Sequence, residues 1–198
     1  MTLTTRRLVV TGMLAAISII LGLTPIGFIP LPFSPTRATI MHIPVIIGSI
    51  VEGPIVGLII GLIFGGFSMY QAATMATNPV QFVFLDPVVA VLPRMLIAIT
   101  SYYAYRGVKA LLERDSSAVA AGMVAAAVGT LTNTVGVLLA IYLRHGAEYA
   151  EKLGVAPEAV GGVIMGIAVT HGIPEIIVAI FIVTAVLQAL QRIYRRTF

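Results

Sequence analysis

Several runs of about 20 mostly apolar residues restrict the fold of this chain more than any other feature. A helix of that length crosses the roughly 30 Å hydrocarbon layer of a membrane, where backbone polar groups must be hydrogen-bonded within the protein. Charged residues make up only 10% of the chain, and the mean hydropathy is +1.04. We therefore predict an all-α integral membrane protein, a single bundle of six transmembrane helices in one domain.

Prolines, glycines and polar segments divide the apolar pattern into these six helices. Pro25 ends the first, a Glu52-Gly53-Pro54 turn separates the second from the third, and Asp86-Pro87 has the pattern of an N-cap followed by a first-turn proline. The predicted helices span about residues 8–23, 36–51, 54–70, 86–106, 116–143 and 159–193. We interpret residues 25–35 and 71–85 as loops, and residues 144–158 as a loop or short surface helix.

The distribution of lysine and arginine predicts the orientation in the membrane. Cytoplasmic loops carry the excess of these residues. If both termini are cytoplasmic, the outer loops hold Arg144 and Lys152, and the inner side holds the larger set Arg6, Arg7, Arg106, Lys109, Arg114, Arg192, Arg195 and Arg196. The basic residues thus lie at the ends of spans, so the net charge of +4 does not indicate a nucleic-acid partner.

Four polar residues inside the predicted spans are the candidate functional residues. A central arginine in a membrane costs about 2.5–3.5 kcal/mol, so Arg94 is expected to face a partner or a cavity. Asn133 lies in the fifth helix, and His171 and Glu175 lie one turn apart in the sixth. One hypothesis is a substrate site lined by all four residues. The other is a structural Arg94–Glu175 ion pair, with Asn133 bonded to backbone.

Two further polar residues of the second helix are less specific. Arg37 lies near the outer interface, where it either joins the site or extends toward the headgroups. His42 reads as a hydrogen-bonded packing residue. A metal site from His42, His171 and Glu175 lacks ligand spacing, so we expect no metal and no cofactor.

A small-residue surface on the first helix is a candidate partner interface. Gly12 and Ala16 are four residues apart, with Ala15 and Ile19 in the adjacent stripe, and small residues let membrane helices approach closely. Packing within the bundle is the alternative interpretation.

Missing motifs exclude several function classes. The chain has no cysteine, no phosphate-binding loop Gly-x-x-x-x-Gly-Lys-Ser/Thr, no Gly-x-Ser-x-Gly and no His-Glu-x-x-His. An enzyme using His171 and Glu175 as acid and base is therefore disfavoured. Six helices without a clear internal repeat also differ from many autonomous carriers, so transport would need a partner.

Two segments resemble a known family. Residues 37–48 (RATIMHIPVIIG) with 52–65 (EGPIVGLIIGLIFG), and Asn78-Pro79 with 85–94 (LDPVVAVLPR), are similar to the substrate-binding S components of energy-coupling factor (ECF) transporters, most of all to the pantothenate-type members. The resemblance implies a vitamin held by the last three helices and covered by outer loops. It also implies a transmembrane coupling subunit, two ATPase subunits and the cytoplasmic membrane of a bacterium or archaeon.

The resemblance gives roles to the candidate residues. Arg94 matches the Leu-Pro-Arg element and would bind a substrate carboxylate, while Tyr70, Gln71 and Asn78 would contribute from the loop between helices three and four. The family's Ala-x-x-x-Ala coupling motif is replaced here by Gly12-x-x-x-Ala16. Other S-component substrates (folate, riboflavin, hydroxymethylpyrimidine or thiamin) and an autonomous small-solute carrier remain the alternatives.

Overall fold

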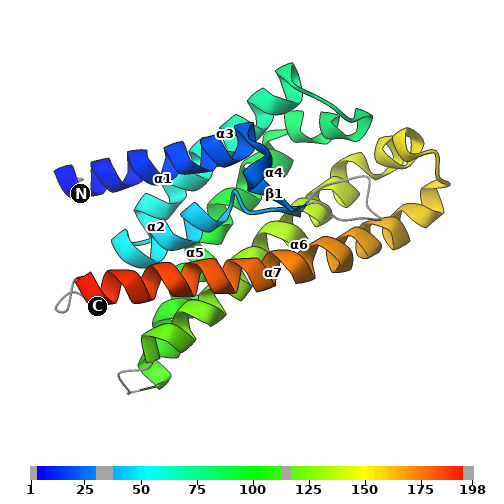
Figure 1. The fold of residues 1–198 in the computed structure, drawn as a ribbon. Helices are drawn as coiled ribbons and strands as arrows, with labels where there is room; N and C mark the ends of the chain where they lie inside the picture. Colours follow the sequence, from blue (N-terminus) through cyan, green and yellow to red (C-terminus); the bar gives the residue numbers. More distant parts are fainter. Residues whose placement is uncertain (1–3, 30–37, 113–116, 194–198) are drawn as a thin grey trace.

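The computed structural model describes residues 4–29, 38–112 and 117–193, and these are almost entirely helical (Figure 1). In chain order the elements are α1 (Thr5–Leu23), the 3₁₀ helix η1 (Pro25–Gly27), β1 (Phe28–Ile29), β2 (Ala38–Thr39), α2 (Ile43–Glu52), α3 (Pro54–Thr74), the 3₁₀ helix η2 (Pro79–Leu85), α4 (Pro87–Ala90), α5 (Leu92–Leu111), α6 (Ser117–Leu153), the 3₁₀ helix η3 (Pro157–Ala159) and α7 (Val160–Ile193).

Within the described residues, five helical segments are long and apolar enough to cross a membrane. They are Thr5–Leu23, Pro54–Thr74, Pro87–Leu111, Ala118–Leu153 and Pro157–Ile193. The remaining apolar helix, α2, has 10 residues, and at 1.5 Å per residue it covers about half of the hydrocarbon layer. The prediction of a multi-span helical protein is confirmed, and the sixth crossing stays a prediction.

The second predicted helix begins later than expected. Phe28 pairs with Thr39 and Ile29 with Ala38 in a two-stranded antiparallel ribbon, so α2 begins at Ile43 and not near residue 36. Helical periodicity within residues 36–51 cannot show this pairing, because the pairing depends on a second segment of the chain. Arg37 lies outside the described residues.

Helical structure covers most of residues 71–85, which were predicted as a loop, and most of residues 144–158, which were predicted as a loop or short surface helix. Helix α6 continues to Leu153 through residues with good helix propensity and ends before Gly154, whose φ of 68° suits glycine. Helix α3 continues to Thr74, and η2 follows after the Asn78 side chain accepts a hydrogen bond from the Val80 N–H (3.1 Å). The predicted helix start at Asp86 is confirmed, since its Oδ1 accepts the Val88 N–H at 2.9 Å.

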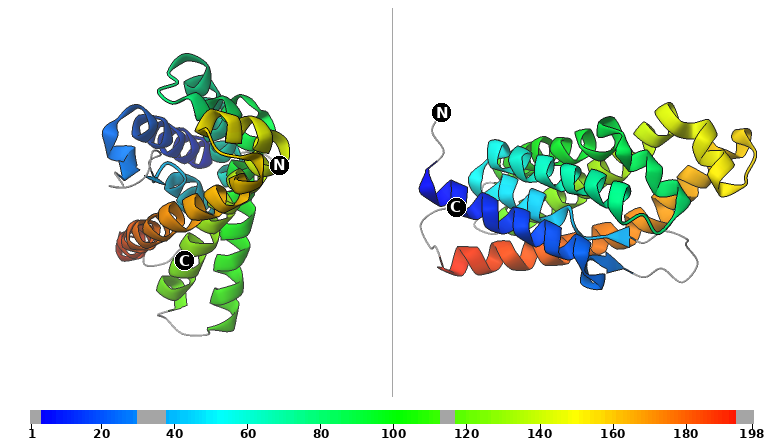
Figure 2. Two further views of the ribbon diagram at one scale, coloured as in Figure 1. Left: turned by 90° about the vertical axis from the view of Figure 1, so that its right-hand side faces the viewer. Right: turned by 90° about the horizontal axis from the view of Figure 1, so that it is seen from above.

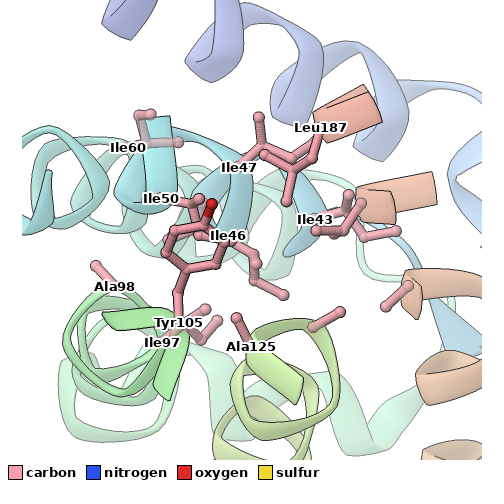
Figure 3. Close-up of a cluster of buried hydrophobic side chains, with 14 of the residues drawn as sticks. Ile43, Ile46, Ile47, Ile50, Ile60, Ile97, Ala98, Tyr105, Ala125 and Leu187 are labelled. Carbon is pink, nitrogen blue, oxygen red and sulfur yellow. The ribbon is translucent and has the colours of Figure 1, made fainter. Parts of the chain in front are cut away.

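Helix α2 occupies the centre of the main core (Figure 3). Its isoleucines lie among side chains from four helices, which include Ile60 of α3, Ile97 of α5, Ala125 of α6 and Leu187 of α7. Because α2 is buried on nearly all sides, its sequence is apolar without a polar stripe. The core thus fixes α3, α5 and α7 relative to one another.

The bundle has two distinct ends. The first residues of α1 and the last described residues of α7 lie at one end, and the turn between α6 and α7 lies at the other (Figures 1 and 2). Helix α1 packs on α2 and α3.

Gly61 and Gly65 are four residues apart and form a ridge on α3 that lies close to the segment carrying Arg94. A Cβ atom at Gly61 would lie 2.5 Å from the Arg94 carbonyl oxygen, and one at Gly65 would lie 2.6 Å from the Val91 Cα. Such distances leave no room for a side chain. The ridge therefore packs inside the bundle, which is typical of small residues in closely packed membrane helices.

We expect Gly61→Ala to destabilise the protein by about 1–3 kcal/mol, because backbone atoms must move to admit the methyl group. The matched control is Gly66→Ala, where a Cβ meets no atom within 4 Å. The melting temperature of the detergent-purified protein measures the effect. Equal melting temperatures for the two variants would contradict the close packing.

Candidate functional site

A cavity of about 670 Å³ lies at the end of the bundle near η2. Its walls come from α3, η2, α5, α6, α7 and strand β2. The polar and charged residues that line it are Thr39, Ser68, Gln71, Thr77, Asn78, Gln81, Arg94, Asn133, Thr134, Tyr149, His171 and Glu175. The four candidate residues from the predicted spans thus border one space.

Arg94 is held by a carbonyl and two aromatic rings, and no carboxylate of the described residues pairs with it. It lies in the first turn of α5 and is only 6% exposed. Pro93 has no N–H to donate to the Val89 carbonyl four residues before it. The Arg94 Nη1 donates to that carbonyl instead, at 2.6 Å. The phenyl rings of Phe64 and Phe84 lie 5.3 Å and 5.2 Å from the guanidinium carbon, within cation–π range.

Glu175 is satisfied by neutral donors from two other elements. The Thr39 N–H donates to Oε1 at 2.7 Å, and the Thr134 hydroxyl donates to Oε2 at 3.0 Å. In the described part of the chain no guanidinium nitrogen of Arg94 lies within 4.0 Å of this carboxylate. A direct Arg94–Glu175 ion pair is therefore not formed, although both residues line the cavity.

Two polar atoms of the cavity residues have no hydrogen-bond partner among the described residues. They are the Arg94 Nε, which is a donor, and the Asn133 Oδ1, which is an acceptor. Asn133 is 7% exposed. Its Oδ1 accepts no hydrogen bond from the backbone of the described residues, which argues against the hypothesis that this oxygen serves only the backbone. Buried polar atoms nearly always have partners, so two such exceptions in the lining of one cavity mark it as a candidate binding site.

The remaining candidate residues take different positions. Gln71 lines the cavity and donates from Nε2 to the Gly22 carbonyl at 2.8 Å. Asn78 lines it as well, but its Oδ1 caps η2. Tyr70 does not belong to the lining; it is 53% exposed and its ring stacks on Phe67.

The second-helix histidine is a packing residue, as the sequence indicates. His42 is fully buried, and its Nε2 lies 2.9 Å from the Thr130 hydroxyl. It is not part of the cavity lining, which includes His171 and Glu175. The three groups therefore do not border one common space.

Sequence reasoning missed several residues that shape the cavity. Thr39 reaches it only through the β ribbon, and Tyr149 lies in a part of α6 that was predicted as loop. Phe64 and Phe84 carry no sequence signal for a contact with an arginine. Thr134 could have been predicted as a cavity residue, because it follows Asn133 in the polar group of the fifth predicted helix.

The candidate partner surface on α1 is divided between two faces. Gly12 and Ala16 are exposed, and a Cβ at Gly12 meets no atom within 4 Å. Ile19 is half-buried. Ala15 is 4% exposed and packs inward with Thr11, Ser18 and Gly22, so it lies off the exposed face, and its role as a contact residue stays a prediction. A spacing of three to four residues places these four on one helix face.

The fold and the cavity define a multi-span helical membrane protein with a polar cavity beside a buried cation. A family model described as "ECF transporter, substrate-specific component" matches residues 6–187, and the chain belongs to this family.

Two similar proteins have narrower names. "Pantothenic acid transporter PanT" of Lactococcus lactis subsp. cremoris is 34% identical over 175 residues, covering 81% of each chain. "Pantothenate transporter PanT" of Leuconostoc mesenteroides is 28% identical over 186 residues, covering 92% of this chain and 90% of its own.

We expect Thr134→Val to lower stability by about 1–3 kcal/mol, because one oxygen of the buried Glu175 carboxylate loses its donor. Thr132→Val is the control. It removes a 2.9 Å bond between two hydroxyls, Thr132 and Thr100, neither of which lines the cavity. Thermal unfolding should show the larger loss for Thr134→Val; a larger loss for Thr132→Val would argue against a buried carboxylate that depends on the Thr134 hydroxyl.

Proposed function

We propose that this protein is the substrate-capture subunit of an ECF-type importer and that its substrate is pantothenate. One observation carries the proposal most: the cavity holds a buried guanidinium with an unpartnered Nε and no carboxylate partner within salt-bridge distance among the described residues. An anionic ligand supplies that partner. The names of the two similar transporters narrow the anion to pantothenate.

The cavity groups complement the chemistry of pantothenate. Its carboxylate accepts from Arg94, for which a guanidinium is well suited because it offers several donors in one plane. Its amide N–H or a hydroxyl donates to the Asn133 Oδ1, while His171 and Glu175 serve the hydroxyl end. A volume of about 670 Å³ is in the usual range for a pocket that encloses a small molecule.

In the membrane, we propose six crossings with both termini in the cytoplasm. Helix α2 would be the sixth, a short helix surrounded by protein, with the β ribbon on the side of the outer face. The cavity end, with η2 and the α6–α7 turn, would then face outward. The membrane would be the cytoplasmic membrane of a bacterium.

Substrate binding by purified protein tests the assignment. We expect pantothenate to bind with a submicromolar Kd, and Arg94→Gln to weaken it about 10- to 150-fold, the value of one charged hydrogen-bonded contact. Arg106→Gln, an exposed residue far along α5, is the control. Isothermal titration, or native mass spectrometry with folate, riboflavin and thiamin as competitors, gives the constants. Unchanged binding in Arg94→Gln would remove the residue from the site.

The proposed partners are a transmembrane coupling subunit and two ATPase subunits. Helix α1 offers them an exposed apolar face in which Gly12 and Ala16 make a shallow, small-residue surface. The chain itself has no phosphate-binding loop. ATP hydrolysis would therefore come from the partners.

We expect Gly12→Leu to leave pantothenate binding unchanged and to reduce ATP-dependent uptake by more than about fivefold, because the added side chain blocks close helix contact. Gly66→Leu on α3, which also meets open space, is the control. The measurement is uptake of labelled pantothenate into proteoliposomes with and without the coupling subunits. Uptake without them would instead support an autonomous carrier.

A further inference from the structure

Asp86 joins two segments at the cavity end of the bundle. Its Oδ1 accepts the Val88 N–H and caps α4. Its Oδ2 contacts the Nε of Arg144 and the Nε2 of His145, the latter at 3.0 Å. The carboxylate is largely buried, with 9% of the side chain exposed. Both partners, Arg144 and the ionisable His145, belong to the outer part of α6, which leads to the α6–α7 turn.

The segments on each side of Asp86 hold Arg94. On the C-terminal side, α4 ends with the Val89 carbonyl directed at the Arg94 Nη1 (2.6 Å). On the N-terminal side, η2 carries Phe84, whose ring lies 5.2 Å from the guanidinium carbon. A displacement of Asp86 therefore moves two of the groups that orient the guanidinium.

Helix α4 is the first turn of the helical segment Pro87–Leu111 and joins α5 through Val91. At its start, the N–H groups of the first turn depend on a cap for a hydrogen-bond acceptor. The cap and the contacts with α6 fix its first residue. The ring of Phe82, also in η2, meets the His145 ring edge-on at 5.7 Å, which adds a second contact between η2 and α6.

We propose that Asp86 is a positioning residue for the anion-binding Arg94: Arg144 and His145 hold its carboxylate, and α4 and η2 transmit that position to the guanidinium. The inference rests on the proposed function, in which Arg94 binds the substrate carboxylate. The outer part of α6 thereby sets the affinity for the charged end of the substrate without touching it.

The protonation state of Asp86 supports this role at working pH. Its hydrogen bond from Arg144 is the main reason that its pKa is lowered from 3.8 to about 2. A lowered pKa means that the stabilisation is fully present above pH 3.8 and is lost only as the pH falls through about 2. The carboxylate contacts are thus intact in a binding assay at pH 7.

If Asp86 positions Arg94, replacing it should weaken the binding of a charged ligand more than the binding of a neutral one. Asp86→Asn keeps a good N-cap acceptor but removes the charge that holds Arg144. Arg144→Gln removes the same contact from the other side. We expect each variant to weaken pantothenate about tenfold, while pantothenol, which has an alcohol in place of the carboxylate, changes less than about twofold. Lys152→Gln, an exposed charge on the same part of α6, should change neither.

Titration of the purified full-length protein with both ligands gives these constants, and Arg144→Lys should recover part of the loss. Hydrogen–deuterium exchange without ligand is the second readout: peptides covering residues 86–91 should exchange faster in Asp86→Asn and Arg144→Gln than in Lys152→Gln. Equal losses for the two ligands, or no loss for either, would overturn the positioning role.

The two proposals fail in different ways. If the wild-type protein binds no pantothenate, the proposed substrate is wrong, and the exchange measurement alone decides whether Asp86 fixes α4. Unchanged exchange in residues 86–91 would then overturn the inference. If Asp86→Asn does not fold, Arg144→Gln carries the same comparison, because that side chain is 51% exposed.

Discussion

The buried guanidinium of Arg94 is the constraint on which the site depends. A cation in an apolar surrounding is costly unless it is paired or hydrogen-bonded. Here Pro93 leaves the Val89 carbonyl without a backbone donor, and Arg94 uses it, while the rings of Phe64 and Phe84 supply cation–π contacts. This solvation is partial, since the Nε stays unpartnered within the described part of the chain. Part of the charge is thus left for a ligand in the cavity.

The core keeps this arrangement rigid. Helix α2 has no solvent-facing side along its middle, and it fixes α3, α5 and α7 through close apolar packing. The glycines of α3 bring that helix against the backbone of Arg94 itself, where a Cβ at Gly61 would lie 2.5 Å from the Arg94 carbonyl. A guanidinium attached to such a backbone has little freedom to move toward a misplaced ligand. Rigidity of this kind reduces the ordering cost of binding.

Sequence reasoning predicted the parts of the molecule that local chemistry determines. The long apolar helices, the start at Asp86-Pro87 and the cavity residues Arg94 and Asn133 all follow from local pattern and from the cost of polar groups in a membrane. It did not predict the β1–β2 ribbon, which replaces the expected start of the second helix, or the donor from Thr39 to Glu175, which joins segments far apart in sequence. The inward direction of Ala15 was missed because α1 is apolar on both faces.

Arg94 and Glu175 differ in how fully the surrounding protein satisfies their hydrogen-bonding groups, and this difference explains how one cavity can favour an anion. Glu175 already has a donor on each oxygen, from Thr39 and Thr134, so its charge is partly compensated within the protein. Among the described residues, Arg94 and Asn133 each keep an unpartnered atom, one donor and one acceptor. A ligand that supplies a carboxylate and an N–H or O–H group completes both atoms. A ligand that lacks either group leaves a buried polar atom unsatisfied, and such a defect discriminates more strongly than a lost apolar contact.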